Sequence, residues 1–314
     1  CPTWPRCTAE SFISTPEMGI HGVIEFGNRL LTFVLVAIAI GMFLMVVRMR
    51  RERPELFRLS LAIGLGILAQ VVIGGITVLT ELDPSLVGLH FVVSTALVVL
   101  ATVLVYRVFT GPRGAAIALP ILYRPLAAFA AVALAVTILV GILTTGSGPH
   151  AGDGGAARNG LDSELLQHLH SWPAYVTFGA TILLFAGAHF LHLPRTRRFV
   201  ALLIGIEVVQ IVVGVAQARL GLPEILVGIH MVLACALAAA MTIVWLSLRE
   251  SAGPVSGLSR SEQGLSERTQ SARDDSERQQ RVDADRDEYE REVTDRAVED
   301  AHGLQLAAPN GRAE

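Results

Sequence analysis

The sequence predicts an all-α integral membrane protein made of two related helical units. Three observations lead to this fold class: a body that is poor in charge, seven long apolar stretches and an internal repeat. Residues 1–249 hold 16 Arg and 12 acidic residues, so only 28 of 249 side chains are charged. Such a body cannot be exposed to water, which excludes a soluble enzyme. All 25 basic residues are Arg, which excludes Schiff-base chemistry and a P-loop lysine.

Each of the seven apolar stretches is long enough to cross a bilayer, which takes roughly 20 helical residues. Helices satisfy their own backbone hydrogen bonds in lipid, so a helical bundle is favoured over a β-barrel, whose strands would alternate over about ten residues. The expected spans are residues 24–47, 59–80, 86–109, 121–144, 166–191, 199–219 and 225–248.

The distribution of Arg predicts the orientation, because cytoplasmic loops are enriched in positive charge. Twelve Arg lie beyond the same ends of the spans, whereas only Arg6, Arg158 and Arg219 lie beyond the opposite ends. We therefore expect a multi-pass protein of the cell membrane with an external N-terminal loop, residues 1–23, and a cytoplasmic tail. The tail, residues 250–314, holds 9 Arg and 16 acidic residues and few apolar ones, so we expect it to be disordered.

An internal repeat relates residues 61–100 to residues 201–240 at an offset of 140, without a gap. The aligned pairs are Gln70 with Gln210, Gly74 with Gly214, and Val87-Gly-Leu-His90 with Val227-Gly-Ile-His230. The fourth span has no counterpart in the first half. The repeat therefore predicts two pseudo-symmetric four-helix units, with the first helix of the first unit absent from this chain. We expect the N-terminal unit over 24–109 and the C-terminal unit over 121–248.

Histidines inside the apolar spans are the first candidates for chemistry, because an ionisable group at membrane depth usually has a function. His90 and His230 occupy equivalent places, which fits axial ligands of a haem between helices. Another metal, or purely structural histidines, are the alternatives. In the C-terminal unit the partner of His230 is either His168 or His170, since these two lie about 200° apart around a helix. Extending the offset of 140 pairs Asn28 with His168, which favours His168.

The first expected span begins with a second group of polar residues. Glu25 and Arg29 are four residues apart and can pair on one helix face, either as an ordinary interfacial pair or as a carboxylate that handles protons beside a ligand. His21 lies two turns before Asn28 and could replace a ligand there, or it is an ordinary interfacial histidine.

The roles of four other residues remain open on the sequence alone. Glu207 is either an intramembrane proton relay or a hydrated residue near the boundary. Cys235, in the middle of a span, is expected to be a small buried apolar residue. Cys1 and Cys7 lie in the external loop, where a disulfide is chemically permitted.

In combination, these motifs resemble the haem A synthase family over about residues 1–248. The matching segments are CPTWPRC, IEFGNR, VGLH, TGSGPHAGD, QHLH and VGIH. The resemblance implies two four-helix units and oxidation of the C8 methyl of haem O to the formyl of haem A, for cytochrome oxidase assembly. It also implies a haem b cofactor in the C-terminal unit, the substrate haem in the N-terminal unit and haem O synthase as supplier. The electron partner is not implied.

The resemblance also assigns roles to individual residues. Glu25 matches the acidic residue of the family's Glu-x-x-His-Arg motif and would be catalytic, with Arg29 beside it. Asn28 stands where many members have the motif histidine, so the substrate haem would be held by His90 alone or with His21. The remaining assignments are His168 and His230 as ligands of haem b, with His170 as rival, and Cys1 and Cys7 as the external cysteine pair.

Two other functions compete with this one. A di-haem cytochrome b-type protein that transfers electrons with quinone predicts two permanently bound haems with two histidines each. A transporter predicts broken helices at the bilayer midplane, whereas these histidines lie towards one face.

Overall fold

The computed structural model of the chain describes residues 3–149, 156–251 and 279. Within these residues there are seven helices long and apolar enough to cross a membrane, which confirms the predicted fold class. A short 3-10 helix, η1 (Pro16–Met18), precedes the first of them. The seven helices are α1 (Gly19–Val47), α2 (Pro54–Leu79), α3 (Pro84–Thr110), α4 (Tyr123–Ser147), α5 (Ser163–Phe190), α6 (Pro194–Arg219) and α7 (Glu224–Ser247).

The helices alternate in direction and define two ends of the bundle. One end, here called the histidine end, carries the N-terminal segment and the connections α2–α3, α4–α5 and α6–α7. The other, the arginine end, carries the connections α1–α2, α3–α4 and α5–α6. Proline at the first helical position starts α2, α3 and α6, because its missing N–H would be unpaired there in any case.

The repeat seen in the sequence is also a repeat of backbone conformation. The turns α2–α3 and α6–α7 each place two successive residues at positive φ, Glu81 and Leu82 in one turn and Gly221 and Leu222 in the other. In both turns the second of these residues donates its N–H to the carbonyl five residues earlier, at 2.8 Å. Two turns that match residue by residue at the offset of 140 support an ancestral duplication.

The two halves meet where α3 packs against α7. The hydroxyl of Thr95 and the sulfur of Cys235 lie 3.7 Å apart at this contact. These residues are themselves separated by 140, so equivalent positions of the two repeats touch, as they do at a pseudo-two-fold axis. Cys235 is half-buried rather than fully buried, and it is a free thiol.

The larger hydrophobic core belongs to helices α4–α7. Alanines on α4 bring the helix backbones close together, which is how small residues stabilise helix pairs in a membrane. Tyr123 closes this core and donates its hydroxyl to the carbonyl of Leu184 at 2.9 Å. The core residues include Ala127, Ala130, Leu134, Ala180, Leu184, Val200, Leu203 and Val244.

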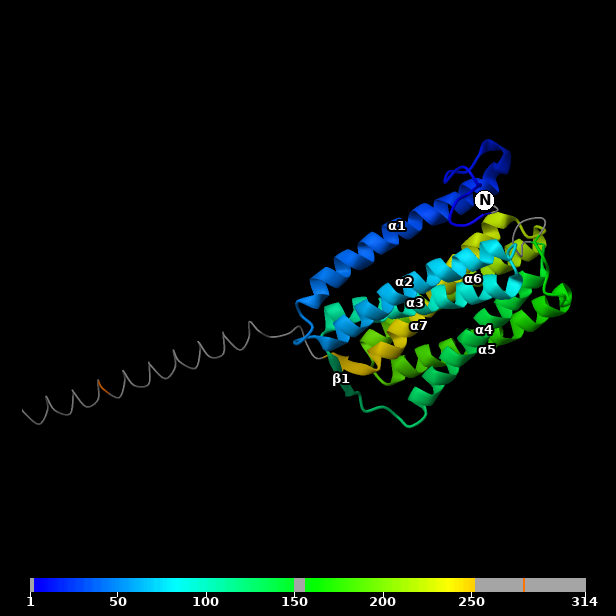
Figure 1. The fold of residues 1–314 in the computed structure, drawn as a ribbon. Helices are drawn as coiled ribbons and strands as arrows, with labels where there is room; N and C mark the ends of the chain where they lie inside the picture. Colours follow the sequence, from blue (N-terminus) through cyan, green and yellow to red (C-terminus); the bar gives the residue numbers. More distant parts are fainter. Residues whose placement is uncertain (1–2, 150–155, 252–278, 280–314) are drawn as a thin grey trace, which may run out of the picture. The chain divides into compact units, whose positions relative to one another are not determined.

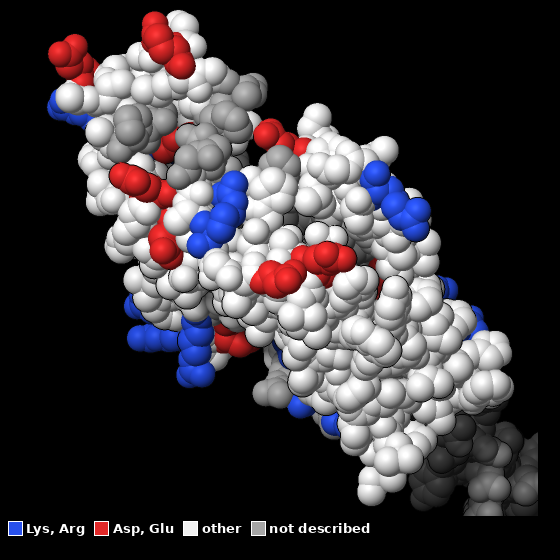
Figure 2. Space-filling model, turned by 90° about the vertical axis from the view of Figure 1, so that its right-hand side faces the viewer, with Lys and Arg blue, Asp and Glu red and all other residues white. Residues whose placement is uncertain are grey.

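The first three helices form a smaller core near the arginine end, made by Val46, Leu56, Ile63 and Leu104. Helix α1 packs chiefly against α2 and lies at the margin of the bundle (Figure 1). Much of the molecular surface is uncharged and apolar (Figure 2), as expected where helices face lipid.

One short sheet at the arginine end was not predicted from the sequence. Strand β1 (Arg113–Ala116) pairs antiparallel with β2 (Arg249–Ser251). Arg124 secures the same region by donating to the carbonyls of Ile117 and Leu248, at 2.9 and 3.2 Å. Strand β2 reaches into the expected tail and ends at Ser251. Residues 252–278 and 280–314 of this tail lie outside the described residues, so its expected disorder stays a prediction.

Candidate functional site

Two histidines of the C-terminal half face each other across the bundle. His170 on α5 and His230 on α7 have ring centres 6.1 Å apart, with the ring planes inclined by 69°. The Nδ1 atoms of both rings are buried and have no hydrogen-bond partner. Two half-buried imidazoles that face one another, each with an unpartnered Nδ1, form a candidate site for a ligand between them.

Glycines on the neighbouring helices make room for these rings. A Cβ atom on Gly141 of α4 would lie 2.8 Å from Cε1 of His170. A Cβ atom on Gly214 of α6 would lie 3.0 Å from Cε1 of His230. Both distances are shorter than ordinary van der Waals contact, so any larger residue would push an imidazole out of place.

The same arrangement recurs around His90 on α3. Gly74 of α2 would place a Cβ atom 3.2 Å from Cε1 of His90. One helical turn earlier, Gln70 donates its amide to the carbonyl of His90 at 3.0 Å. In the second repeat Gln210 donates to the carbonyl of His230 at 3.1 Å. His90 and His230 are therefore held in equivalent ways, each by a glutamine and a glycine of the preceding helix.

A cavity of about 680 Å³ opens beside the His170–His230 pair. This volume is within the ~300–1,000 Å³ that is usual for small-molecule and cofactor sites. The lining comes from α3, α4, α5, α6 and α7 and is mostly apolar. Its ionisable residues are Glu164, His168, His170, Tyr175, Glu207, Arg219 and His230.

The structure favours the rival ligand over the first choice. His168 is exposed and also lines the cavity, but it is the ring of His170 that faces His230. The preference for His168 rested on carrying the offset of 140 back to the first expected span. The connections differ by three residues, because residues 48–53 separate α1 from α2 and residues 191–193 separate α5 from α6. The offset of 140 that relates α2 to α6 therefore does not carry over to α1 and α5.

The histidine end of the N-terminal half is built differently. Asn28 is exposed on α1, and the side chain of His21 lies outside the described residues. Among the described residues, no histidine ring is paired with His90 as His170 is with His230. Within the described residues, the N-terminal half therefore offers one half-buried histidine, His90, where the C-terminal half offers a facing pair.

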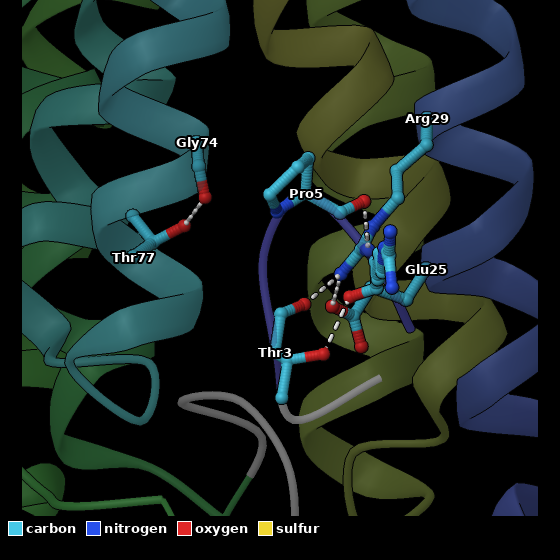
Figure 3. A network of polar contacts seen from close by, with 7 residues as sticks. Thr3, Pro5, Glu25, Arg29, Gly74 and Thr77 are labelled. Carbon is cyan, nitrogen blue, oxygen red and sulfur yellow. Dashed lines mark hydrogen bonds and ion pairs between the residues drawn. The ribbon is translucent and has the colours of Figure 1, made fainter. Parts of the chain in front are cut away.

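Glu25 and Arg29 form the predicted ion pair, with the nitrogen and oxygen 2.7 Å apart. Arg29 also donates to the carbonyls of Thr3 and Pro5, both at 3.1 Å. Figure 3 shows the N-terminal segment held in this way between the pair on α1 and the end of α2. Trp4 lies against α2, where a Cβ atom on Gly75 would be 2.7 Å from the indole ring.

Cys7 is fully buried within this N-terminal segment. Its backbone N–H donates to the carbonyl of Ser11 at 3.0 Å, which closes a compact turn. Cys1 lies outside the described residues, so the predicted Cys1–Cys7 disulfide stays a prediction.

The comparison with known families can now be set beside this geometry. A model of the COX15-CtaA family, described as cytochrome oxidase assembly protein, matches residues 1–242. The chain belongs to this family. The match covers helices α1–α6 and ends within α7. No curated protein and no solved structure matches the chain. The resemblance inferred from the motifs is confirmed, and with it a role in cytochrome oxidase assembly and haem A synthesis.

COX15-CtaA membership implies haem chemistry, and the cavity fits a haem on two observations. Imidazoles are common axial ligands of haem iron, and those of His170 and His230 face each other with ring centres 6.1 Å apart, so these two residues would hold it. The cavity that these residues line has a volume of about 680 Å³ and is mostly apolar, and the Nδ1 atoms of both rings have no hydrogen-bond partner. The described residues contain no group of three or more His, Cys, Asp or Glu that could hold a metal ion, whereas a haem iron takes only two axial ligands.

Sequence reasoning about this COX15-CtaA member missed the functional meaning of several residues. Gln70, Gln210, Gly74 and Gly214 were recognised only as marks of the repeat, although they support His90 and His230. The sequence did contain a signal, because polar and small residues that both repeats share inside apolar helices indicate a functional or packing role. Gly141 had no such signal, since its counterpart would lie before the first span.

Proposed function

We propose that the protein is a haem A synthase, which oxidises the C8 methyl group of haem O to the formyl group of haem A. The observation that carries this proposal is the facing pair His170–His230 beside a cavity, in a member of a family of cytochrome oxidase assembly proteins. Among the described residues, a facing histidine pair occurs in the C-terminal half alone. This difference supports one permanent cofactor and one exchangeable substrate.

In this proposal His170 and His230 are the axial ligands of a haem b cofactor. His170 replaces His168 as the preferred ligand because its ring faces His230 and because Gly141 of α4 leaves space for that ring. When bound, the haem supplies one-electron redox chemistry. The protein contributes orientation, since Gln210 fixes the turn of α7 that carries His230.

The substrate haem O would bind in the N-terminal half, with His90 towards its iron. Gln70 and Gly74 hold His90 as their counterparts hold His230. Asn28 stands on α1, on the same side of the bundle end as Glu25, and would contact the substrate without ligating its iron. His21 is the other proposed contact, one turn before Glu25.

With water as the oxygen source, converting a methyl to a formyl group releases four electrons and four protons, so the reaction also needs an external electron acceptor. A proton acceptor is therefore needed beside the methyl group. Glu25 is the proposed acceptor, because its carboxylate is half-buried at the histidine end and is oriented by Arg29. The N-terminal segment, bound to Arg29 through two carbonyls, would cover this site and limit the access of water.

Three parts of the proposal concern the surroundings of the site. The histidine end would face the outside of the cell membrane and the arginine end the cytoplasm. Cys1 and Cys7 would form a disulfide in the segment that covers the substrate site. Haem O synthase would supply the substrate.

Haem extraction from cells that express the protein together with a source of haem O tests the function. We expect haem A to appear and haem O to fall. In a matched strain that expresses the Glu25→Gln variant, the protein should bind haem b normally and the cells should accumulate haem O. Cells that contain the protein with bound haem b, together with haem O, but that form no haem A would contradict the proposal.

A further inference from the structure

One carboxyl group of the C-terminal half has no part in the function described so far. Glu207 lies in the middle of α6 and is only 5% exposed. Its Oε1 accepts a hydrogen bond of 2.9 Å from the hydroxyl of Thr181 on α5, a residue that is itself fully buried. Its Oε2 is buried and has no hydrogen-bond partner, and the residue lines the cavity beside His170 and His230.

Such a group is costly in the interior of a membrane protein. A buried polar atom without a partner destabilises the fold, so a carboxyl in this place usually has a function. Packing alone does not require it, because the repeat places Ile67 at the equivalent position of α2. The same helix position is thus filled by an ordinary apolar residue in one half and by a carboxyl in the half with the histidine pair.

Glu207 does not stand alone on its helix face. Gln210, Gly214 and Gln217 follow it at intervals of three and four residues, which places all four on one side of α6. All four line the cavity, and they lead from the middle of the helix to the histidine end. In α2 the corresponding residues are Ile67, Gln70, Gly74 and Thr77, so only the second half carries a carboxyl at the inner end of this polar face.

Unpaired polar atoms are concentrated around the same cavity. In the described part of the chain, nine buried side-chain nitrogen or oxygen atoms lack a hydrogen-bond partner, and five of them belong to residues that line it. Although the lining as a whole is mostly apolar, a group of unpaired polar atoms of this kind is where ordered water bridges them. The five atoms are His170 Nδ1, Glu207 Oε2, Gln210 Oε1, Gln217 Oε1 and His230 Nδ1.

We propose that Glu207 is a proton-exchange site of this cavity, which binds and releases a proton as the charge at the His170–His230 pair changes. Water held by Gln210 and Gln217 connects the carboxyl to the histidine end of the bundle. The inference rests on the proposed haem b at the histidine pair. When a redox mediator delivers one electron to the bound iron, one proton from solution joins the Glu207 carboxylate, so the added charge is balanced.

The position of Glu207 makes such coupling strong. Gln210 binds the carbonyl of His230, and Glu207 precedes Gln210 by three residues, or about 4.5 Å of helix rise. Charges interact more strongly in this interior than in water because the local dielectric is low. The other ionisable residues around the cavity are Glu164, His168, His170 and Tyr175 on α5, Arg219 on α6 and His230 on α7.

A redox titration of the purified haem-loaded protein at several pH values tests the inference. One proton taken up per electron changes the equilibrium tenfold per pH unit, which is about 59 mV for a one-electron couple. We expect the midpoint potential of the parent to depend on pH and that of Glu207→Gln to lose this dependence. Glu164→Gln, the same substitution at an exposed carboxyl of the same cavity, should behave like the parent.

Infrared difference spectra of the reduced and oxidised protein give an independent readout. The parent should show the carbonyl band of a protonated carboxyl that shifts in D2O, and Glu207→Gln should lose it. If Glu207→Gln does not bind haem, Thr181→Val serves instead, because loss of the hydroxyl bonded to the carboxyl should move this band. A band at the same frequency in Thr181→Val would overturn the inference.

The outcomes separate the two proposals. A parent protein without bound haem contradicts the proposed function. A parent that binds haem, with a potential independent of pH or with the same dependence in Glu207→Gln, contradicts the proton-exchange site alone.

Discussion

The two halves of the molecule share one plan but differ in how completely they are built. Both place a histidine on their last helix and hold it with a glutamine and a glycine of the helix before. In the part of the chain that the structure describes, the C-terminal half alone adds a second, facing histidine, a four-helix core and a buried carboxyl. The difference indicates that a duplicated scaffold can keep a closed cofactor site in one copy and an open substrate site in the other.

The largest expected effect comes from removing the histidine of each half in turn. His230→Ala should abolish haem b binding, because a facing pair loses one of its two ligands. His90→Ala should leave the haem b spectrum unchanged and stop production of haem A. Haem content and visible spectra of the two purified variants measure this contrast. Equal loss of haem b in both would remove the distinction between the two halves.

A glycine substitution tests how closely the C-terminal site is packed. Gly141→Ala places a methyl group 2.8 Å from Cε1 of His170, and overpacking of this kind costs about 1–3 kcal/mol. Haem affinity should fall by roughly 5- to 150-fold. Gly205→Ala is the matched control, because nothing lies within 4 Å of its Cβ position. Haem titration of both variants measures the effect, and equal affinities would show that the glycine is not needed.

The N-terminal segment is expected to depend on Arg29. Arg29→Gln weakens the contacts with Thr3 and Pro5, which are partly exposed and worth about 1 kcal/mol. Hydrogen exchange of residues 3–8 should then become about fivefold faster. Arg158→Gln, the same substitution in another loop at this end of the bundle, should leave that exchange unchanged. If neither variant changes the exchange rate, the segment is held by other contacts.

The smallest effect is expected in the C-terminal core. Tyr123→Phe removes the hydrogen bond to the carbonyl of Leu184 and leaves that buried group unpaired, at a cost of about 1 kcal/mol. The melting temperature should fall by roughly 2–4 °C. Tyr175→Phe is the control, since Tyr175 is 65% exposed. Identical melting curves for the two variants would contradict the assigned role of Tyr123.

Much of this architecture could be read from the sequence because the bilayer imposes simple rules. Span lengths follow from bilayer thickness, and all seven helices were predicted within a few residues of their ends. The repeat could be recognised because Gln, Gly and His are conspicuous in apolar helices. The turns at Leu82 and Leu222, which share one backbone conformation, agree with it. The strand pair β1–β2 could not be predicted, because its partners are far apart in sequence.

The site was only partly predictable, for a geometric reason. His168 and His170 are both compatible with a ligand, and only the rotation of α5 decides which one faces α7. An offset that holds for α2 and α6 does not carry over connections of different length, so the repeat and the facing ring geometry favour different histidines. The partnerless Oε2 of Glu207 and the space beside Gly141 likewise depend on neighbours from other helices, which a single sequence does not specify.

The central claim is that His170 and His230 form the ligand pair of a bound haem b. Its most direct test is the haem content and low-spin spectrum of purified His170→Ala and His168→Ala, prepared in parallel with the parent. The facing geometry predicts that His170→Ala loses the bound haem, while His168→Ala keeps the parental spectrum and stoichiometry. Loss of haem in His168→Ala with a normal spectrum in His170→Ala would contradict the claim.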